Sequence, residues 1–361
     1  MKKLFIRILS LLFRRKKIIP PLDKLFSHIN QNYLNILIVR QHNQLGDMLL
    51  SVPLFRAFKE KFPNSFLSVV SSHENYDAIK SNKYIDEVIL FDKRKFKNPL
   101  ELLRFLKKLR SKSYFIGVVP STVSISFTSN LLCRLAKCDY RIGPKSLNGK
   151  QNDSSFLFDY QIDLDFRDED QPNPRHISDK ILDIVRPFGI DTSDLQSHIL
   201  IKEEDENFAN DFFGNYNGLK IGLHIGAGKI PNRWNIDNFA ILIDELIKKY
   251  NPLIYLTIGY WDEDLLKRLL DKIKISPKIL KNESISRIAA VIDKSDLFIS
   301  NDTGIMHVAG ATRCPLIAIF GPTNPKIWSP IGPNKFYLWQ SNDINAVTVN
   351  QVLKLVEDIL K

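Results

Sequence analysis

The feature that most constrains the fold is a pair of short apolar segments joined by a polar, glycine-containing turn. Residues 297–300 and 315–320 have the length and composition of buried parallel strands. Between them, the turn at 301–304 leads into residues 305–311, which we expect to form a short helix. A strand, a turn, a helix and a second strand in this order predict part of an open α/β sheet.

The turn between these two strands has the residues of a ligand site. Asp302 and Thr303 are suited to cap the helix, and Gly304 lets a ligand approach the backbone closely. Free N–H groups and the positive end of the helix dipole attract a phosphate there, and His307 lies one turn further along. A second turn, 321–323, follows the next strand, at the edge where open α/β sheets bind ligands. Each residue alone is explained by capping, core packing or a turn, but together they predict a site.

The same alternation of strands and helices runs through both halves of the chain. It predicts an α/β protein of two Rossmann-like, doubly wound parallel-sheet domains facing a cleft, and 361 residues is a suitable length for two domains. We place a basic amphipathic extension at 1–34, a first domain at 35–200, and a second domain with a C-terminal helix at 201–361. Residues 144–172 are polar without a clear period, so we expect a long loop there.

The positive charge is concentrated at the amino terminus. The net charge is +11, and residues 1–17 contain seven Lys and Arg and no acid, which leaves 11 − 7 = +4 for the rest. This distribution argues against a nucleic-acid-binding fold. Written as a helix, residues 1–17 have one basic and one apolar face, as in a helix that lies on an anionic membrane. A helix packed on the protein's own surface and a frayed terminus are the alternatives.

Two sets of residues suggest chemistry. In the second half, three turns at 226–228, 302–304 and 321–323 should meet at one sheet edge, where Lys229 and Arg233 add cations suited to a nucleotide diphosphate. The dinucleotide and P-loop fingerprints are absent from the sequence. In the first half, Asp47 follows an apolar strand and a polar loop. Its carboxylate could accept a proton from a hydroxyl nucleophile, although, for the residue taken alone, helix capping is the preferred explanation. No His/Cys cluster has metal-ligand spacing, so no metal is expected.

Three segments resemble the signatures of glycosyltransferase family 9, the ADP-heptose:lipopolysaccharide heptosyltransferases. They are NILIVRQHNQLGDMLLSVPLFRAFKEKFP, IGLHIGAGKIPNRWNIDNFAILIDEL and DLFISNDTGIMHVAGATRCPLIAIFGPTNPKIWSP. The resemblance covers roughly residues 35–355 and implies a GT-B fold with an acceptor-binding first domain and a donor-binding second domain. It also implies inverting, metal-independent transfer of L-glycero-D-manno-heptose from an ADP-sugar to a hydroxyl of the lipopolysaccharide core.

The resemblance assigns roles to individual residues. The family's catalytic aspartate falls on Asp47, and its acidic ribose contact falls on Glu263. Its diphosphate and sugar contacts fall on Gly226, Ala227, Asp302, Thr303, Gly304 and His307. The ADP-sugar is a substrate, and no cofactor is expected. One departure is Asn232, which stands where many members have a lysine, so Lys229 or Arg233 would supply the charge. Another is the bulky loop 41–44, which allows a different acceptor or sugar.

The expected acceptor is an anionic, lipid-linked saccharide. Arg40 and Arg141 are its predicted contacts, among these basic residues of the first domain: Arg40, Lys95, Lys97, Arg134, Arg141 and Lys145. We expect the enzyme to act in the cytoplasm, at the inner-membrane surface of a bacterium, with no nucleic-acid partner. The alternatives are a GT-B transferase that uses another nucleotide sugar in surface polysaccharide assembly, a non-catalytic nucleotide-binding protein of envelope assembly, and a sugar-nucleotide epimerase.

Overall fold

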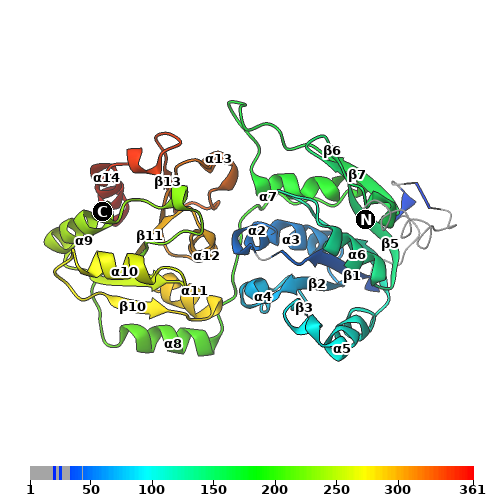
Figure 1. Cartoon of the computed structure of the whole chain (residues 1–361), viewed down its shortest axis with the longest axis horizontal. Coiled ribbons are helices and arrows are strands. Elements are labelled where there is room, and N and C mark those ends of the chain that lie inside the picture. Colours follow the sequence, from blue (N-terminus) through cyan, green and yellow to red (C-terminus); the bar gives the residue numbers. More distant parts are fainter. Residues whose placement is uncertain (1–18, 22–23, 27–32, 43) are drawn as a thin grey trace. The chain divides into compact units, whose positions relative to one another are not determined.

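The computed structural model describes residues 19–21, 24–26, 33–42 and 44–361. The predicted amphipathic helix of residues 1–17 lies outside them. The chain divides into two compact units, Met1–Leu195 and Gln196–Lys361. Each unit is a predominantly parallel sheet covered by helices, which confirms the predicted α/β class (Figure 1).

The first unit contains a seven-stranded sheet in the order β3-β2-β1-β4-β5-β6, and β7 pairs with β5. The strands are β1 (Asn35–Arg40), β2 (Phe66–Ser72), β3 (Glu87–Phe91), β4 (Tyr114–Val118), β5 (Cys138–Leu147), β6 (Lys150–Gln151) and β7 (Tyr160–Leu164). The central strand, β1, runs parallel to both of its neighbours. Its four residues from Ile36 to Val39 are fully buried, as expected for a strand with helices on both faces.

The helices of the first unit are short. They are α2 (Leu45–Leu49), α3 (Val52–Lys61), α4 (His73–Ile79), α5 (Pro99–Leu109), α6 (Phe127–Leu135) and α7 (Ile177–Lys180), with 3-10 turns η3 (Lys95–Lys97), η4 (Ser155–Leu157), η5 (Ile181–Ile184) and η6 (Arg186–Phe188). Pro53 is the second residue of α3 and does not kink a longer helix, because its ring suits the first turn. Gly189 ends η6 with φ +65°, the left-handed conformation that glycine adopts readily.

The predicted loop at 144–172 is wrong in its first part. Residues up to Leu147 belong to β5, Asn148 and Gly149 turn the chain with φ of 53° and 79°, and β6 pairs back antiparallel. β7 then pairs with β5. These strands lack an apolar period because charged residues such as Lys145 and Asp163 pair across them, 2.9 Å apart, on the sheet surface.

The second unit is a six-stranded parallel sheet in the order β10-β9-β8-β11-β12-β13. Its strands are β8 (Lys220–His224), β9 (Leu253–Ile258), β10 (Lys278–Lys281), β11 (Leu297–Asn301), β12 (Leu316–Ile319) and β13 (Lys335–Leu338). Its helices and 3-10 turns are α8 (Glu203–Phe213), η7 (Ile230–Asn232), α9 (Ile236–Tyr250), α10 (Glu263–Leu270), α11 (Ile285–Asp293), α12 (Gly304–Gly310), α13 (Pro325–Trp328), η8 (Ile344–Ala346) and α14 (Val349–Leu360). The predicted unit around residues 297–320 is therefore confirmed.

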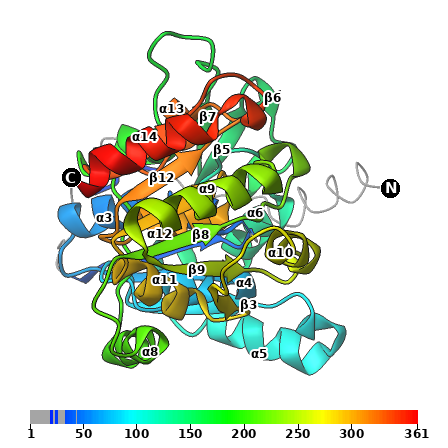
Figure 2. The same ribbon diagram turned by 90° about the vertical axis from the view of Figure 1, so that its left-hand side faces the viewer.

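The helices of this unit cover both faces of its sheet. α9 lies between α10 and α14 on one face (Figure 2), where Phe239, Leu242 and Val352 pack on the buried strand residues Leu223 and Leu256. On the other face, α11 contacts both α8 and α12. Asn235 caps the start of α9 by accepting from the N–H of Asp237, and Asn251 ends the helix with φ +45°.

The register of this sheet brings the predicted site turns to one edge. Ser300 of β11 pairs with His224 at the end of β8, and Asn301 pairs with Ile319 at the end of β12. The turns that follow β8, β11 and β12 therefore leave the sheet side by side. This is the carboxyl edge, where open α/β sheets place their ligands.

Candidate active site

Side-chain hydrogen bonds connect the first two of these turns. The buried amide of Asn301 donates to the carbonyl oxygens of Ile225, at 2.9 Å, and Gly226, at 3.2 Å, and its oxygen accepts from the N–H of Trp234 at 3.2 Å. Trp234 is buried, and its indole N–H donates to the carbonyl of Val347 at 2.8 Å. The conformation of the 225–234 loop is thus fixed by the strand beside it.

Gly226 lies against a buried carboxylate. A Cβ at this position would lie 2.3 Å from Oδ1 of Asp262, whereas a Cβ at Gly228 would meet nothing within 4 Å. Asp262 also accepts from the N–H of Gly259, at 3.1 Å, and its charge opposes the lowering of the His224 pKa that burial causes. The strand ends bring Asp262 under the Gly226 turn, where it is 7% exposed.

Asp302 is the main acid at this edge. Asn232 donates from Nδ2 to Oδ2 of Asp302 at 2.8 Å and to its carbonyl oxygen at 3.3 Å. Burial raises the pKa of Asp302, while a hydrogen bond from Thr323 and the charge of Lys229 act in the opposite direction. The third predicted turn therefore joins the other two through Thr323. Asn232, where the resemblance expects lysine, holds this carboxylate without supplying a charge.

The remaining residues that are predicted to contact the donor lie in the turns and helix starts at this sheet edge. Arg233 donates from Nε to the carbonyl of Ala227 at 2.8 Å, and Thr303 is the N-cap of α12 without a side-chain capping bond. Gly304 begins that helix, and His307 is buried within it. Glu263, at the start of α10, forms an ion pair with Lys281. The predicted contacts of these residues with a donor stay predictions.

Two exposed aromatic residues beside Glu263 were missed by sequence reasoning. Tyr260 and Trp261 follow β9 directly and are 79% and 90% exposed. They lie in the turn that follows β9, the strand next to β8, and this turn also contains Asp262. Large aromatic side chains in full contact with water at a ligand edge offer a flat surface for a ring system. An aromatic pair between a strand end and an acidic helix start was the signal in the sequence.

In the first unit, Asp47 is held at the carboxyl edge of the sheet by Arg40. The Arg40 guanidinium donates to the main-chain carbonyl of Asp47 from Nε, at 3.2 Å, and from Nη2, at 3.1 Å, and lies 3.6 Å from its Oδ1. Thr122 accepts from Arg40 at 3.2 Å and donates to Oδ1 of Asp47 at 3.4 Å. Burial lowers the pKa of Arg40, and Asp47 opposes this effect. Arg40 therefore positions Asp47.

His42 lines the same small pocket as Asp47. Its carbonyl accepts hydrogen bonds from the side chains of Ser72, at 3.2 Å, and Asn75, at 2.5 Å. Burial lowers the pKa of His42 below its usual value, and Arg40 acts in the same direction while Asp47 opposes both. The imidazole is thus biased towards its neutral form at neutral pH.

An uncharged pocket adjoins Asp47. Val123 and Ser124 line both the small Asp47 pocket and a second pocket of about 450 Å³. The second pocket has a polar floor, in which Asn152 and Ser154 share a hydrogen bond of 2.8 Å. The other lining residues are Ile125, Phe127, Leu147, Asn148, Lys150, Gln151 and Asp153. Two opposite charges, on Lys150 and Asp153, are the only ones among them, so amide, hydroxyl and apolar groups dominate this surface.

Arg141 is not brought together with Asp47. Its register partner in β4 is Gly117, which in turn pairs with Leu37 of β1, well before the end of that strand. The buried guanidinium donates to the carbonyls of Cys133 and Ala136, both at 3.3 Å, and lies 3.4 Å from Oδ2 of Asp159. These internal contacts leave its predicted acceptor role without geometric support.

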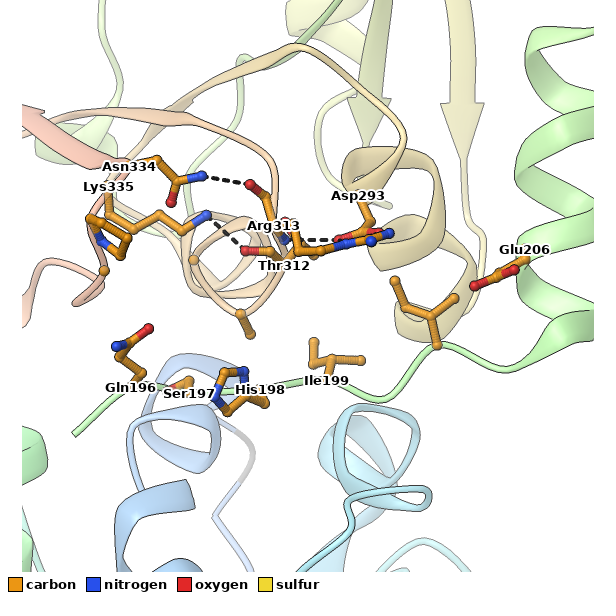
Figure 3. A pocket seen from close by; sticks show the side chains of 15 residues that line it. Gln196, Ser197, His198, Ile199, Glu206, Asp293, Thr312, Arg313, Asn334 and Lys335 are labelled. Carbon is orange, nitrogen blue, oxygen red and sulfur yellow. Dashed lines mark hydrogen bonds and ion pairs between the residues drawn. The ribbon is translucent and has the colours of Figure 1, made fainter. Parts of the chain in front are cut away.

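A further pocket of about 490 Å³ lies at the opposite, amino edge of the second sheet (Figure 3). Its charged groups are engaged with the protein. Arg313 pairs with Asp293, with Nε 3.0 Å from Oδ2, and Lys335 donates to the carbonyls of Ala309, at 3.2 Å, and Thr312, at 2.8 Å. We therefore do not place the donor there, despite the size of this pocket.

In the parts of the chain that the structure describes, no group of three or more His, Cys, Asp or Glu side chains could hold a metal ion. Across those same residues, every helix is too short or too polar to cross a bilayer.

Comparisons with known proteins identify the family of the chain. A family model described as "Glycosyltransferase family 9 (heptosyltransferase)" matches residues 102–354. The chain is 22% identical over 316 residues to lipopolysaccharide heptosyltransferase 3 of Escherichia coli, covering 81% of this chain and 86% of that protein.

Solved structures resemble most of the chain. A glycosyl transferase family 9 from Veillonella parvula has a TM-score of 0.79 at 19% identity, covering 92% of this chain and 98% of that one. The E. coli heptosyltransferase WaaC with ADP has a TM-score of 0.71 at 19% identity, covering 90% and 100%. At these identities the likeness establishes the fold, which is GT-B.

Proposed function

Because this chain belongs to glycosyltransferase family 9, we propose that it transfers heptose from ADP-L-glycero-D-manno-heptose to a hydroxyl of a lipopolysaccharide core acceptor. The proposed reaction inverts the anomeric carbon and needs no metal. Its main support is the set of three turns at the carboxyl edge of the second sheet, where the Asn232–Asp302 hydrogen bond of 2.8 Å fixes an acid beside two cations. That arrangement suits a sugar joined to a diphosphate.

The proposed donor site has separate parts for the diphosphate, the sugar and the nucleoside. The diphosphate lies against Gly226 and Ala227, with Lys229 and Arg233 neutralising its charge. The sugar hydroxyls donate to Asp302, a half-buried acceptor held by Asn232. Thr303, Gly304 and His307 complete this side, as the family resemblance implies.

The nucleoside end of the donor is proposed to lie over the turn that follows β9, the strand next to β8. Glu263 accepts from the ribose hydroxyls, and Tyr260 or Trp261 stacks on the base. The exposure of Trp261, 90%, leaves its ring open to such a contact. Trp261 should therefore report nucleotide binding by a change in its fluorescence.

In the proposed mechanism, Asp47 is the general base. Its carboxylate removes the proton of the acceptor hydroxyl while that oxygen attacks the anomeric carbon of the sugar. The bond from the anomeric carbon to the phosphate oxygen breaks, and its electron pair leaves with ADP. Arg40 and Thr122 hold Asp47 in place through the contacts described above. Pre-organisation of this kind keeps the base aligned with the reacting oxygen.

The acceptor sugar is proposed to bind in the uncharged pocket next to Asp47. Its hydroxyl groups suit Ser124, Gln151 and the other polar residues, and the apolar side chains suit the faces of a sugar ring. Anionic groups of the acceptor then lie outside this pocket. We further propose that the enzyme acts at the cytoplasmic face of the inner membrane, where a lipid-linked acceptor is found.

The test compares the wild type with Asp47→Ala and with Asp47→Asn, which keeps the shape of the side chain. Both variants should bind ADP as the wild type does, because Asp47 belongs to the other unit. Transfer should fall by about two to four orders of magnitude. Unchanged turnover in either variant would exclude Asp47 as the base. A wild type that binds ADP but transfers nothing would favour the non-catalytic alternative.

A further inference from the structure

Positive charge gathers in one folded segment of the first unit. Residues 92–110 contain eight Lys and Arg and two acids, a net charge of +6. Residues 1–17 contribute +7, so the remainder of the chain carries 11 − 7 − 6 = −2. The folded part of the protein therefore has its excess positive charge in the turn after β3 and in α5, and not over its surface in general.

The same segment exposes leucine side chains. Leu100 and Leu103 of α5 are each 61% exposed, and Leu102 is 38% exposed. Leu100 and Leu103 are three residues apart, so they lie on one side of the helix. Lys107 follows four residues later on the same side, and it is exposed as well.

The helix is built so that these leucines point outward. Asn98 caps it by accepting from the N–H of Leu100, and Pro99 is its first residue. Its inner side buries Phe105 and Leu109, and the Phe105 ring packs on Phe91 with centroids 5.2 Å apart. The core beneath α5 is thus filled by other residues. Leu100 and Leu103 remain in contact with water although they belong to a well-capped helix.

The charges beside these leucines are largely available to a partner. Among the described residues, no carboxylate pairs with Lys95, Lys97 or Lys107, all of which are exposed. Lys93 is also exposed and lies over the ring of Phe91. Internal ion pairs use three neighbouring cations: Arg94 with Asp92, Arg104 with Glu101, and Lys108 with Glu87.

The segment belongs to the edge of the sheet that carries Asp47. The turn at residues 92–97 follows the carboxyl end of β3, just as the Asp47 loop follows the carboxyl end of β1, two strands away. Figures 1 and 2 show α5 beside β3, at the outer side of the first sheet. Lys93 is close enough to His42 to help lower the His42 pKa. A partner bound here is thus near the proposed base.

We propose that this surface, called the α5 face and formed by Lys93, Lys95, Lys97, Leu100, Leu103 and Lys107, docks on an anionic phospholipid bilayer. The lysines lie against lipid phosphates, and the two leucines enter the boundary between headgroups and acyl chains. Anionic membrane surfaces attract basic segments, and exposed apolar side chains lose contact with water at that boundary. A nucleic acid would use the lysines but leave the leucines exposed.

This inference deepens the proposed membrane location, but it does not depend on sugar transfer. It gives the enzyme a second contact besides the basic segment 1–17, and stable membrane attachment commonly needs two such signals. Docking through the α5 face would present the Asp47 edge of the first unit to an acceptor that is anchored in the same bilayer.

A fluorescent label distinguishes the α5 face from the amino-terminal segment. The full-length chain is labelled at Leu103→Cys with a polarity-sensitive, thiol-reactive dye. The labelling is selective for this position because Cys133, Cys138 and Cys314 are buried. With vesicles of phosphatidylcholine and phosphatidylglycerol, the emission should shift to the blue and become shielded from a water-soluble quencher. Phosphatidylcholine vesicles should leave it unchanged. The same dye at Ile241→Cys, which is 52% exposed on α9, is the control and should stay water-like.

Affinity measurements give a second test with matched variants. Leu100→Ser with Leu103→Ser, or Lys95→Glu with Lys97→Glu, should each weaken vesicle binding by about tenfold or more. Ile241→Ser and Lys248→Glu, at exposed positions of α9, should leave binding unchanged. All these side chains are exposed, so the midpoint of thermal unfolding should not move.

Two results would overturn the proposal. One is a full-length protein that binds anionic vesicles while the label at residue 103 stays water-like, which would mean that other residues make the contact. The other is the absence of binding to anionic vesicles. Neither result bears on nucleotide binding or on transfer to a soluble acceptor, so a failure here is distinguishable from a failure of the proposed function.

Discussion

Gly226→Ala is the substitution for which the structure gives the sharpest expectation. The added Cβ would lie 2.3 Å from Oδ1 and 2.4 Å from Cγ of Asp262, distances at which one group must move. Asp262 is buried and accepts from the N–H of Gly259 at 3.1 Å, so moving it breaks a contact in the same edge. Overpacking of this kind costs about 1–3 kcal/mol.

Thermal unfolding measures this cost, and Gly228→Ala is the matched control. The midpoint should fall by about 2–4 °C for each kcal/mol in a unit of this size. Gly228→Ala should leave the midpoint unchanged, because a Cβ there meets nothing within 4 Å. The rise of the midpoint with ADP should be smaller in Gly226→Ala, since the turn that faces the diphosphate is displaced. Equal midpoints for the two variants would refute the inferred packing of Gly226 on Asp262.

Substitutions at three other positions test single contacts of the two units. Asn232→Ala should cost about 1–3 kcal/mol of stability by removing the 2.8 Å hydrogen bond to half-buried Asp302. Asn232→Lys should instead tighten ADP binding, measured by calorimetry, by about tenfold; unchanged affinity would argue against a diphosphate here. Since burial raises the pKa of Asp302, its charge appears as the pH rises through that pKa and repels the diphosphate, so ADP affinity should fall over that range. Asp302→Asn should remove this fall in ADP affinity with pH. A pH dependence identical to that of the wild type would contradict the proposed repulsion by Asp302. Arg40→Lys should lower transfer by roughly ten- to a hundredfold with ADP binding retained, because lysine lacks the guanidinium whose two N–H groups hold Asp47. Full activity in this variant would show that Arg40 does not position Asp47.

Local patterns were sufficient to predict the elements that carry the candidate site. The apolar runs before Asp302 and Asp47 are long enough for buried strands, and parallel topology then places both acids at carboxyl edges. Glycines and caps around residues 301–304 likewise predict the start of α12. These features depend on residues close together in the chain, and for that reason composition and spacing reveal them.

Contacts between distant segments could not be predicted in the same way. Asn232 reaches Asp302 across 70 residues, and the Asp262 carboxylate fills the space under Gly226 only once β9 pairs with β8. Arg141 was predicted to contact the acceptor because it is a basic residue of the first domain. Its register in β5 instead directs it to the carbonyls at the end of α6.

The measurement that tests the central claim most directly is thermal stabilisation of the purified full-length protein by ADP, UDP, GDP and CMP at one concentration. A ligand that binds only the native state raises stability by RT ln(1 + [L]/Kd). The account predicts a response selective for ADP, which loses strength in Gly226→Ala and persists in Asp47→Asn. Selectivity for UDP or GDP would contradict an ADP-heptose donor, and no response to any of the four would contradict a nucleotide-sugar site at the carboxyl edge of the second sheet.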